Sequence, residues 1–185
     1  CLNDPDERHP NINICPICTA HPGTLPVINK KAVEAVLKVG LALNSELSVE
    51  SKFDRKNYFY PDLPKGYQIS QYDKPLCLGG YLEIPVYKDD SETPKFKKIR
   101  IRRIHLEEDT ARLVHPLTTG HRQAASSLVD FNRAGIPLME LVTEPDLRSA
   151  QETKEFAKQL QLILRYLEVS ETNMEKGQMR VEANV

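Results

Sequence analysis

The run of residues 53–72 constrains the fold more than any other segment. It holds six of the chain's twelve aromatic residues, interleaved with basic ones. Pro61, Pro64 and Gly66 exclude one long helix or strand, because proline lacks an N–H donor and glycine costs backbone entropy when ordered. The run is therefore expected to fold as a stiff loop that packs the aromatic side chains of residues 58–60 against a sheet.

Helical spacing of apolar residues predicts two helices, over residues 30–44 and 149–169. Ser149 and Glu152 form a capping-box pattern at the start of the second helix. Strand-like or extended runs occupy residues 45–52, 81–87, 97–106 and 128–141. A polar turn is expected at residues 88–94 and a mobile polar loop at residues 115–127. Because helices and strands do not alternate regularly, the pattern favours an α+β fold over a doubly wound sheet.

Composition excludes two classes of protein. Hydrophobic residues make up 40% and charged residues 28%, which suits a globular core. No stretch approaches the ~20 consecutive apolar residues of a membrane helix. A formal net charge of -1 excludes a uniformly basic nucleic-acid-binding coat. Residues 95–103 are locally basic, with six basic residues in nine, and are either a solvated strand face or a contact for phosphate.

The sequence Cys15-Pro16-Ile17-Cys18 points to a metal. Two thiolates with this spacing can hold one tetrahedral zinc ion, so the first 28 residues are expected to form an irregular loop, pinned by zinc. Further candidate ligands are Cys1, His9 and His21. Reduced thiols without metal and a redox disulfide are the alternatives. The disulfide is the least favoured, because no βαβ pattern surrounds these cysteines.

Carboxylates follow the basic run directly, at Glu107, Glu108 and Asp109. In an extended chain Glu107 and Glu108 point to opposite faces, and carboxylates at a strand end suit Mg²⁺. Other acidic candidates on or beside predicted strands are Glu140, Glu144 and Glu182. If they converge on one cleft they would form an ATP–Mg²⁺ site; the alternative is that each pairs with an arginine. Glu140 lies in an apolar run, where burying a carboxylate needs a reason.

Basic side chains beside these carboxylates fit phosphoryl transfer, which depends on positioning and charge neutralisation. The candidates are Arg55, Lys56 and Lys65, which flank the aromatic run, and Arg133. The chain has no G-x-x-x-x-G-K-[ST], G-x-G-x-x-G or G-x-S-x-G motif. A P-loop site, a protein-kinase site and a nucleophile elbow are therefore excluded.

Several runs resemble the B-subunit family of the aspartyl/glutamyl-tRNA amidotransferases. They are residues 22–29, 53–72, 103–109, 128–140 and 143–149. The resemblance implies a largely antiparallel sheet with helices, similar to the glutamine synthetase catalytic domain. It makes residues 1–185 part of one catalytic cradle domain, without the family's helical and tail domains. The family's Glu-x-His strand is also absent, so the segment alone is expected to be inactive.

The resemblance also implies a function. Proteins of this family use ATP and Mg²⁺ to phosphorylate the side chain of Glu or Asp mischarged on tRNA(Gln) or tRNA(Asn). Ammonia made from glutamine by the amidase-type A subunit then displaces the phosphate, and a small C subunit holds A and B together. By resemblance, Glu107 and Glu108 lie at the metal site and channel mouth, Lys56 and Lys65 lie at the channel gate, and Cys15 and Cys18 match a zinc-bearing variant. Such a ligase works in the cytoplasm or an organellar matrix.

Two other functions stay open. One is a non-catalytic module that docks tRNA or a protein partner through the zinc loop and the basic run. The other is a metal-dependent hydrolase built on Glu107, Glu108 and His105. Glutamine-dependent conversion of Glu-tRNA with consumption of ATP separates the ligase from both.

Overall fold

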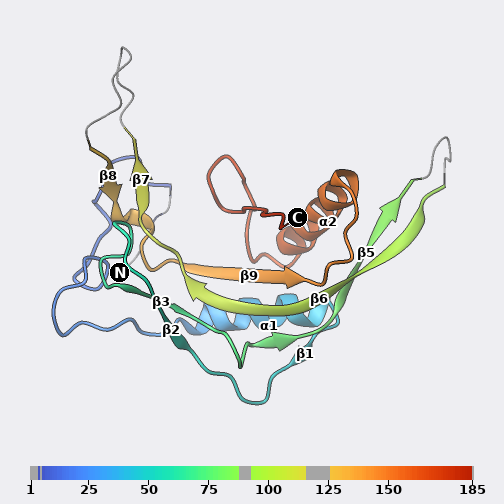
Figure 1. Cartoon of the computed structure of the whole chain (residues 1–185), viewed down its shortest axis with the longest axis horizontal. Coiled ribbons are helices and arrows are strands. Elements are labelled where there is room, and N and C mark those ends of the chain that lie inside the picture. The colour runs from blue at the N-terminus through green and yellow to red at the C-terminus, as the bar shows by residue number, and fades with distance from the viewer. Residues whose placement is uncertain (1–3, 5, 88–92, 116–125, 185) are drawn as a thin grey trace, which may run out of the picture. The chain divides into compact units, whose positions relative to one another are not determined.

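The computed structural model describes residue 4 and residues 6–87, 93–115 and 126–184. Their elements are α1 (Lys30–Ala42), β1 (Glu46–Leu47), β2 (Asp54–Asn57), β3 (Tyr67–Ser70), β4 (Cys77–Leu78), β5 (Tyr81–Val86), β6 (Lys95–Glu108), β7 (Arg112–Val114), β8 (Leu128–Asp130), the 3-10 helix η1 (Phe131–Arg133), β9 (Pro137–Thr143) and α2 (Ala150–Tyr166) (Figure 1). Helices combine with antiparallel strand pairs, which confirms the α+β class. Most of the predicted turn at 88–94 and of the loop at 115–127 lies outside the described residues.

The chain divides into two compact units, which we describe separately. The first unit combines residues 1–29, 52–73 and 106–138, and the second combines residues 30–51, 74–105 and 139–185. The long strand β6 begins in the second unit and ends in the first. None of the described helices is long and apolar enough to cross a membrane.

The first unit contains two small antiparallel pairs, one of which, β2–β3, forms within the aromatic run where a loop was predicted. Strand β2 pairs with β3, and β7 pairs with β8. The prolines lie in the turn between β2 and β3, so the run does avoid a long helix or strand. Residues 4–29, where described, contain turns and bends but no helix or strand.

The predicted packing of the aromatic side chains is wrong at two positions. Phe59 is 92% exposed and Tyr60 is 57% exposed, whereas Tyr58 is half-buried. Phe59 lies over Gly66, so close that a Cβ added at Gly66 would stand 2.8 Å from the ring. Gly66 has φ +74°, a conformation that strains other residues, so the turn depends on glycine for both space and geometry.

In the second unit β6 is the central strand of a five-stranded sheet. The strand order is β1-β4-β6-β5, and β9 also pairs with β6 (Figure 1). Side chains of β6 alternate: Ile99 and Ile101 are buried, whereas Arg100 and Arg102 are exposed. Helix α1 contacts β1 and β4, and α2 contacts both β5 and α1. The apolar face of the sheet is thus covered by helices, as the alternation in the sequence predicts.

Both predicted helices are confirmed, and the start of α2 differs in detail from the predicted capping box. The Ser149 hydroxyl accepts a hydrogen bond from the Glu152 N–H, as an N-cap should. The hydrogen bonds of the Glu152 carboxylate go elsewhere than to the Ser149 N–H, its partner in a capping box. It accepts from the Arg148 N–H at 2.7 Å and from Lys97 Nζ at 2.8 and 2.9 Å. This carboxylate therefore ties the helix start to β6.

Candidate functional site

The first unit contains a row of three buried carboxylates, Glu107, Glu108 and Asp109, at the end of β6. Strand alternation stops here, because β6 is buried on both sides from Ile104 onward. A buried carboxylate is costly unless it is hydrogen-bonded or paired with a cation. The partners of the three side chains therefore define the site.

Glu107 is held by side chains of β3. Its two carboxylate oxygens accept from Gln68 Nε2 at 3.1 Å and from Ser70 Oγ at 2.9 Å. Residues two apart on a strand share a face, so β3 presents both donors together. Gln68 and Ser70 were not identified from the sequence, because neither residue type is a signal for chemistry on its own.

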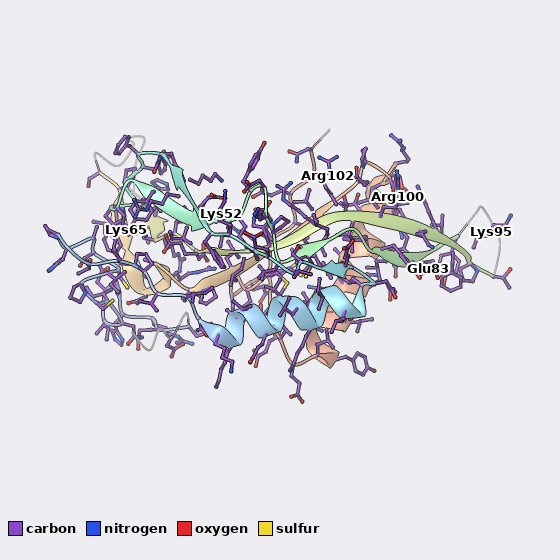
Figure 2. All side chains as sticks on the ribbon, turned by 90° about the horizontal axis from the view of Figure 1, so that it is seen from below. Lys52, Lys65, Glu83, Lys95, Arg100 and Arg102 are labelled. Carbon is purple, nitrogen blue, oxygen red and sulfur yellow. The ribbon has the colours of Figure 1, made fainter. Side chains whose placement is uncertain are left out.

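Glu108 is held by a cation and a backbone amide. Its Oε1 atom lies 2.8 Å from Lys65 Nζ and accepts from the Ile69 N–H at 2.9 Å. Both side chains of the ion pair are only 11% exposed. Lys65 Nζ also lies 5.3 Å from the centroid of the Tyr67 ring, within range of a cation–π contact. Figure 2 shows Lys65 at the turn end of the β2–β3 pair and Lys52 at the other end.

Asp109 completes the row and pairs with Arg133. The Oδ2 atom of Asp109 lies 2.7 Å from the guanidinium, which η1 carries. The backbone of Asp109 is fixed as well, because it donates to Ile136 O and accepts from the Gly135 N–H. The sequence placed Arg133 as a phosphate contact, and the structure shows that it already has a carboxylate partner.

Negative charge gathers around this row. Burial, together with the charges of Asp62 and the row itself, raises the pKa of the Tyr58 phenol. A cavity of about 30 Å³ lies beside the row, and Asp62, Lys65, Glu108 and Asp109 are among its lining residues. The Oδ1 atom of Asp62 is buried without a hydrogen bond from any described residue. Asp62 is thus a further acidic residue of the site that the sequence did not single out.

The two cysteines of the N-terminal loop lie together. Cys15 Sγ and Cys18 Sγ are 3.5 Å apart, close enough to share a tetrahedral ion with Zn–S bonds near ~2.3 Å. Burial opposes ionisation of Cys15, but hydrogen bonds from the Cys18 N–H and thiol outweigh it, so the pKa of Cys15 is lowered. Burial raises the pKa of Cys18. Cys1 lies outside the described residues, and Cys77 belongs to the second unit.

The remaining basic candidates lie on the surface. Lys56 and Arg55 are exposed on β2, and each lies over an aromatic ring, that of Tyr58 or Tyr67. The Nζ atom of Lys56 lies over the Tyr58 ring, 5.8 Å from the centroid, and the expectation that Lys56 lies beside the carboxylates stays a prediction.

The other acidic candidates belong to the second unit. Glu140 is exposed, so the expected burial in its apolar run is wrong; its Oε2 atom lies 3.8 Å from His105 Nε2. Glu144 forms a bidentate pair with Arg102, which matches the alternative that each carboxylate meets an arginine. Glu182 is exposed and lies outside any helix or strand, so its predicted place beside a strand is also wrong.

Comparison with known proteins gives consistent results. The family model described as the GatB/GatE catalytic domain matches residues 1–185. The B subunit of the aspartyl/glutamyl-tRNA(Asn/Gln) amidotransferase of Thermosynechococcus vestitus is 55% identical over 95% of this chain and 35% of its own length. The corresponding B subunit of Thermomicrobium roseum is 54% identical over the whole chain and 36% of its own length. That of Symbiobacterium thermophilum is 56% identical over 95% of the chain and 35% of its own length.

The chain therefore spans about a third of the length of these relatives. The family match covers the carboxylate row, the β2–β3 pair and the cysteine loop together. Such a match across the whole chain, with relatives above 50% identity, shows the family: the chain belongs to the GatB/GatE catalytic domain family.

Proposed function

We propose that this chain forms part of the ATP-dependent catalytic domain of a tRNA-dependent amidotransferase. The reaction converts Glu or Asp mischarged on tRNA(Gln) or tRNA(Asn) into Gln or Asn. The observation that carries the proposal is the row of buried carboxylates, each with its own defined partner. Burying three adjacent carboxylates costs stability, and active sites are where proteins commonly bear such a cost.

The donor chemistry of the row fits Mg²⁺, which prefers carboxylate oxygens. Glu107 is the stronger candidate ligand, because Gln68 and Ser70, which donate to it, are neutral. The Oε1 atom of Glu108 is taken by an ammonium and an amide. We therefore assign Glu107 to the metal and Glu108 to the lysine pair. Roles for Glu140 and Glu182 as further ligands stay predictions.

ATP with Mg²⁺ would supply the phosphoryl group that turns the substrate carboxylate into an acyl phosphate, with ADP released, and ammonia would then displace the phosphate. The protein's part is to hold charge in place during that transfer. Arg133, anchored by Asp109, and the exposed Arg55 are the proposed phosphate contacts. Lys65 and Lys56 are the proposed gate for ammonia, with the Lys65–Glu108 pair as its closed form.

The test is the Glu107→Gln variant in the full-length protein with its partner subunits. We expect ATP-dependent amidation of Glu-tRNA to fall by at least about 100-fold. The reason is that the metal ion, which would neutralise negative charge on the phosphates in the transition state, loses a ligand. Glutamine hydrolysis by the partner subunit should persist. Glu34→Gln, on the exposed surface of α1, is the matched control and should amidate normally. Full amidation by the Glu107 variant would exclude this carboxylate as a metal ligand.

We further propose a structural zinc ion at Cys15 and Cys18. The close sulfurs and the lowered pKa of Cys15 both suit a metal that binds thiolates. Full-length protein should carry about one zinc by elemental analysis, and Cys15→Ser with Cys18→Ser should lose it. Cys77→Ser should retain the zinc, since Cys77 belongs to the second unit. Equal zinc content in all three proteins would refute the site.

The proposed assembly follows from the names of the relatives, which are subunits of an amidotransferase. We propose an amidase-type A subunit, a small C subunit and mischarged tRNA as partners. A complex with this role in translation would work in the cytoplasm or an organellar matrix.

A further inference from the structure

The second unit contains a basic pocket that takes no part in the carboxylate row or the cysteine loop. Its volume is about 370 Å³. The lining residues are Lys97, Lys98, Arg100, Asp146 and Arg148. They come from β6 and from the segment before α2. Lys97 is paired with Glu152, so the four cations face two carboxylates and the pocket keeps a positive excess.

Arg100 is held in one orientation but retains donors for a ligand. Its Nε and NH2 atoms donate to the two oxygens of Asp146 at 2.9 and 2.6 Å, and its backbone N–H donates to Asp146 as well. A guanidinium has five N–H donors, of which this pair uses two. The Arg100 side chain is 64% exposed, so the remaining donors face solvent. Ordering such a side chain on binding costs little entropy, because the ion pair already orders it.

The pocket continues as a row of cations along the exposed face of β6. Lys98, Arg100 and Arg102 occupy alternate positions, which are roughly 7 Å apart on one face of a strand. Arg102 repeats the arrangement of Arg100, with a bidentate pair to Glu144 and a side chain that is 54% exposed. In Figure 2, Arg100 and Arg102 lie together on the side of β6 away from α1.

The shape of this surface favours a polyanion over a nucleotide. A nucleotide site needs an open aromatic or apolar face for the base, whereas the Tyr81 ring is covered by Lys98 Nζ at 3.8 Å from its centroid. Together with the carboxylates that pair with Arg100 and Arg102, the row keeps one net positive charge. Such an extended row can still meet successive phosphates of a chain, since each guanidinium has further donors beside its carboxylate partner. Arg102, at one end of the row, is not among the residues that line the pocket, so a single small anion held in the pocket would leave it unused.

We propose that the pocket and the row bind the phosphate backbone of RNA. Contacts of this kind fix the position of the nucleic acid and carry no sequence information. The inference deepens the proposed function and rests on it only for the identity of the RNA as the tRNA substrate.

The experiment measures tRNA affinity of the full-length complex, without ATP, over a range of salt concentrations. Lys98→Ala with Arg148→Ala should weaken binding about three- to tenfold at low salt, to a similar extent for different tRNAs. The slope of log K against log salt should become shallower by about 1 for each cation removed. The matched control is Lys30→Ala with Lys38→Ala, which removes the same charge from the exposed surface of α1 in the same unit and should bind normally.

Three outcomes would overturn the proposal. They are unchanged tRNA affinity in the pocket variant, an equal loss in the α1 control, and a raised KM for ATP with normal tRNA affinity. Lys98→Arg with Arg148→Lys keeps both charges and should bind like the wild type, and a loss of tRNA affinity as large as that of the alanine variant would also overturn the charge-based proposal. Glu107→Gln should bind tRNA normally whether or not it amidates. Failure of the proposed chemistry and failure of the RNA surface are therefore separate results.

Discussion

At the scale of single residues, the ion pair of Lys65 and Glu108 matters for stability because both charges are nearly buried. An exposed pair of this kind is worth only about 0–1 kcal/mol. The side chains are in fact 11% exposed, and the carboxylate oxygen also accepts a backbone hydrogen bond. Removing one partner from a buried pair leaves an uncompensated charge, which costs far more than the pair contributes.

Lys65→Met should therefore lower the free energy of unfolding by about 3–5 kcal/mol. Lys65→Met combined with Glu108→Gln should recover a large part of that loss, since the buried charge is gone. The measurement is urea unfolding of the full-length wild type, the two single variants and the double variant, which together form a double-mutant cycle. Additive losses in the double variant would mean that the two side chains are not coupled in solution.

The sequence located the three carboxylates but could not rank them. Glu107 and Glu108 are adjacent and chemically identical, and contacts distant in sequence help to distinguish them: Glu107 accepts from Gln68 and Ser70, whereas Glu108 pairs with Lys65. Those partners come from β3 and the turn before it, about 40 residues earlier, and local pattern carries no information about such contacts. Glu140 shows the opposite error. An apolar run suggested burial, whereas the Glu140 side chain is exposed on β9, between half-buried neighbours.

At the scale of elements, the packing of α1 on β4 depends on Gly40. A Cβ added there would overlap Cys77 Sγ and stand 3.2 Å from the Cys77 Cβ. Cys77 is fully buried, and burial raises the pKa of its thiol to about 11, so the group is neutral at ordinary pH. Both atoms lie in the core, where the neighbours have little room to move.

Gly40→Ala should accordingly destabilise the protein, although alanine is the better helix former by about 1 kcal/mol. Overpacking costs about 1–3 kcal/mol, which leaves a net loss on the order of 1 kcal/mol. Adding Cys77→Ala removes the overlapping sulfur, so the double variant should be more stable than the sum of the single variants predicts. Thermal unfolding measures both effects, and strict additivity would contradict this account of the contact.

Elements with strong local patterns were predictable and those without were not. Helices α1 and α2 and the alternation of β6 follow from the spacing of apolar residues. The β2–β3 pair was missed because its strands are short and β2 is mostly polar and exposed. Phe59 was expected to pack inward on account of its hydrophobicity, but the ring lies over Gly66 in the same turn and stays in solvent.

At the scale of the whole molecule, the proposed gate can be tested by comparing two sources of nitrogen, glutamine and free ammonium. In the complete complex, Lys65→Met should reduce glutamine-driven amidation more than amidation driven by free ammonium. The ratio of the two rates within one variant cancels any loss of folded protein. Lys56→Met is the comparison, because Lys56 is exposed and lies over Tyr58. Equal losses with both nitrogen sources would indicate that Lys65 serves the phosphoryl step or binding instead.

The length of β6 has a consequence for how this chain can vary. Exposed cations and buried isoleucines alternate from Lys98 to Arg102, and the strand then runs into the carboxylate row. Inserting or deleting one residue between Ile99 and Ile104 would turn every side chain on one side of that position to the opposite face of the sheet. Arginines would then enter the core, and isoleucines would face water. Substitutions at the exposed positions of this stretch should cost less stability than an odd change of length, which misplaces every residue on one side of it. Any insertions that relatives carry should therefore fall in the connections at either end of the strand.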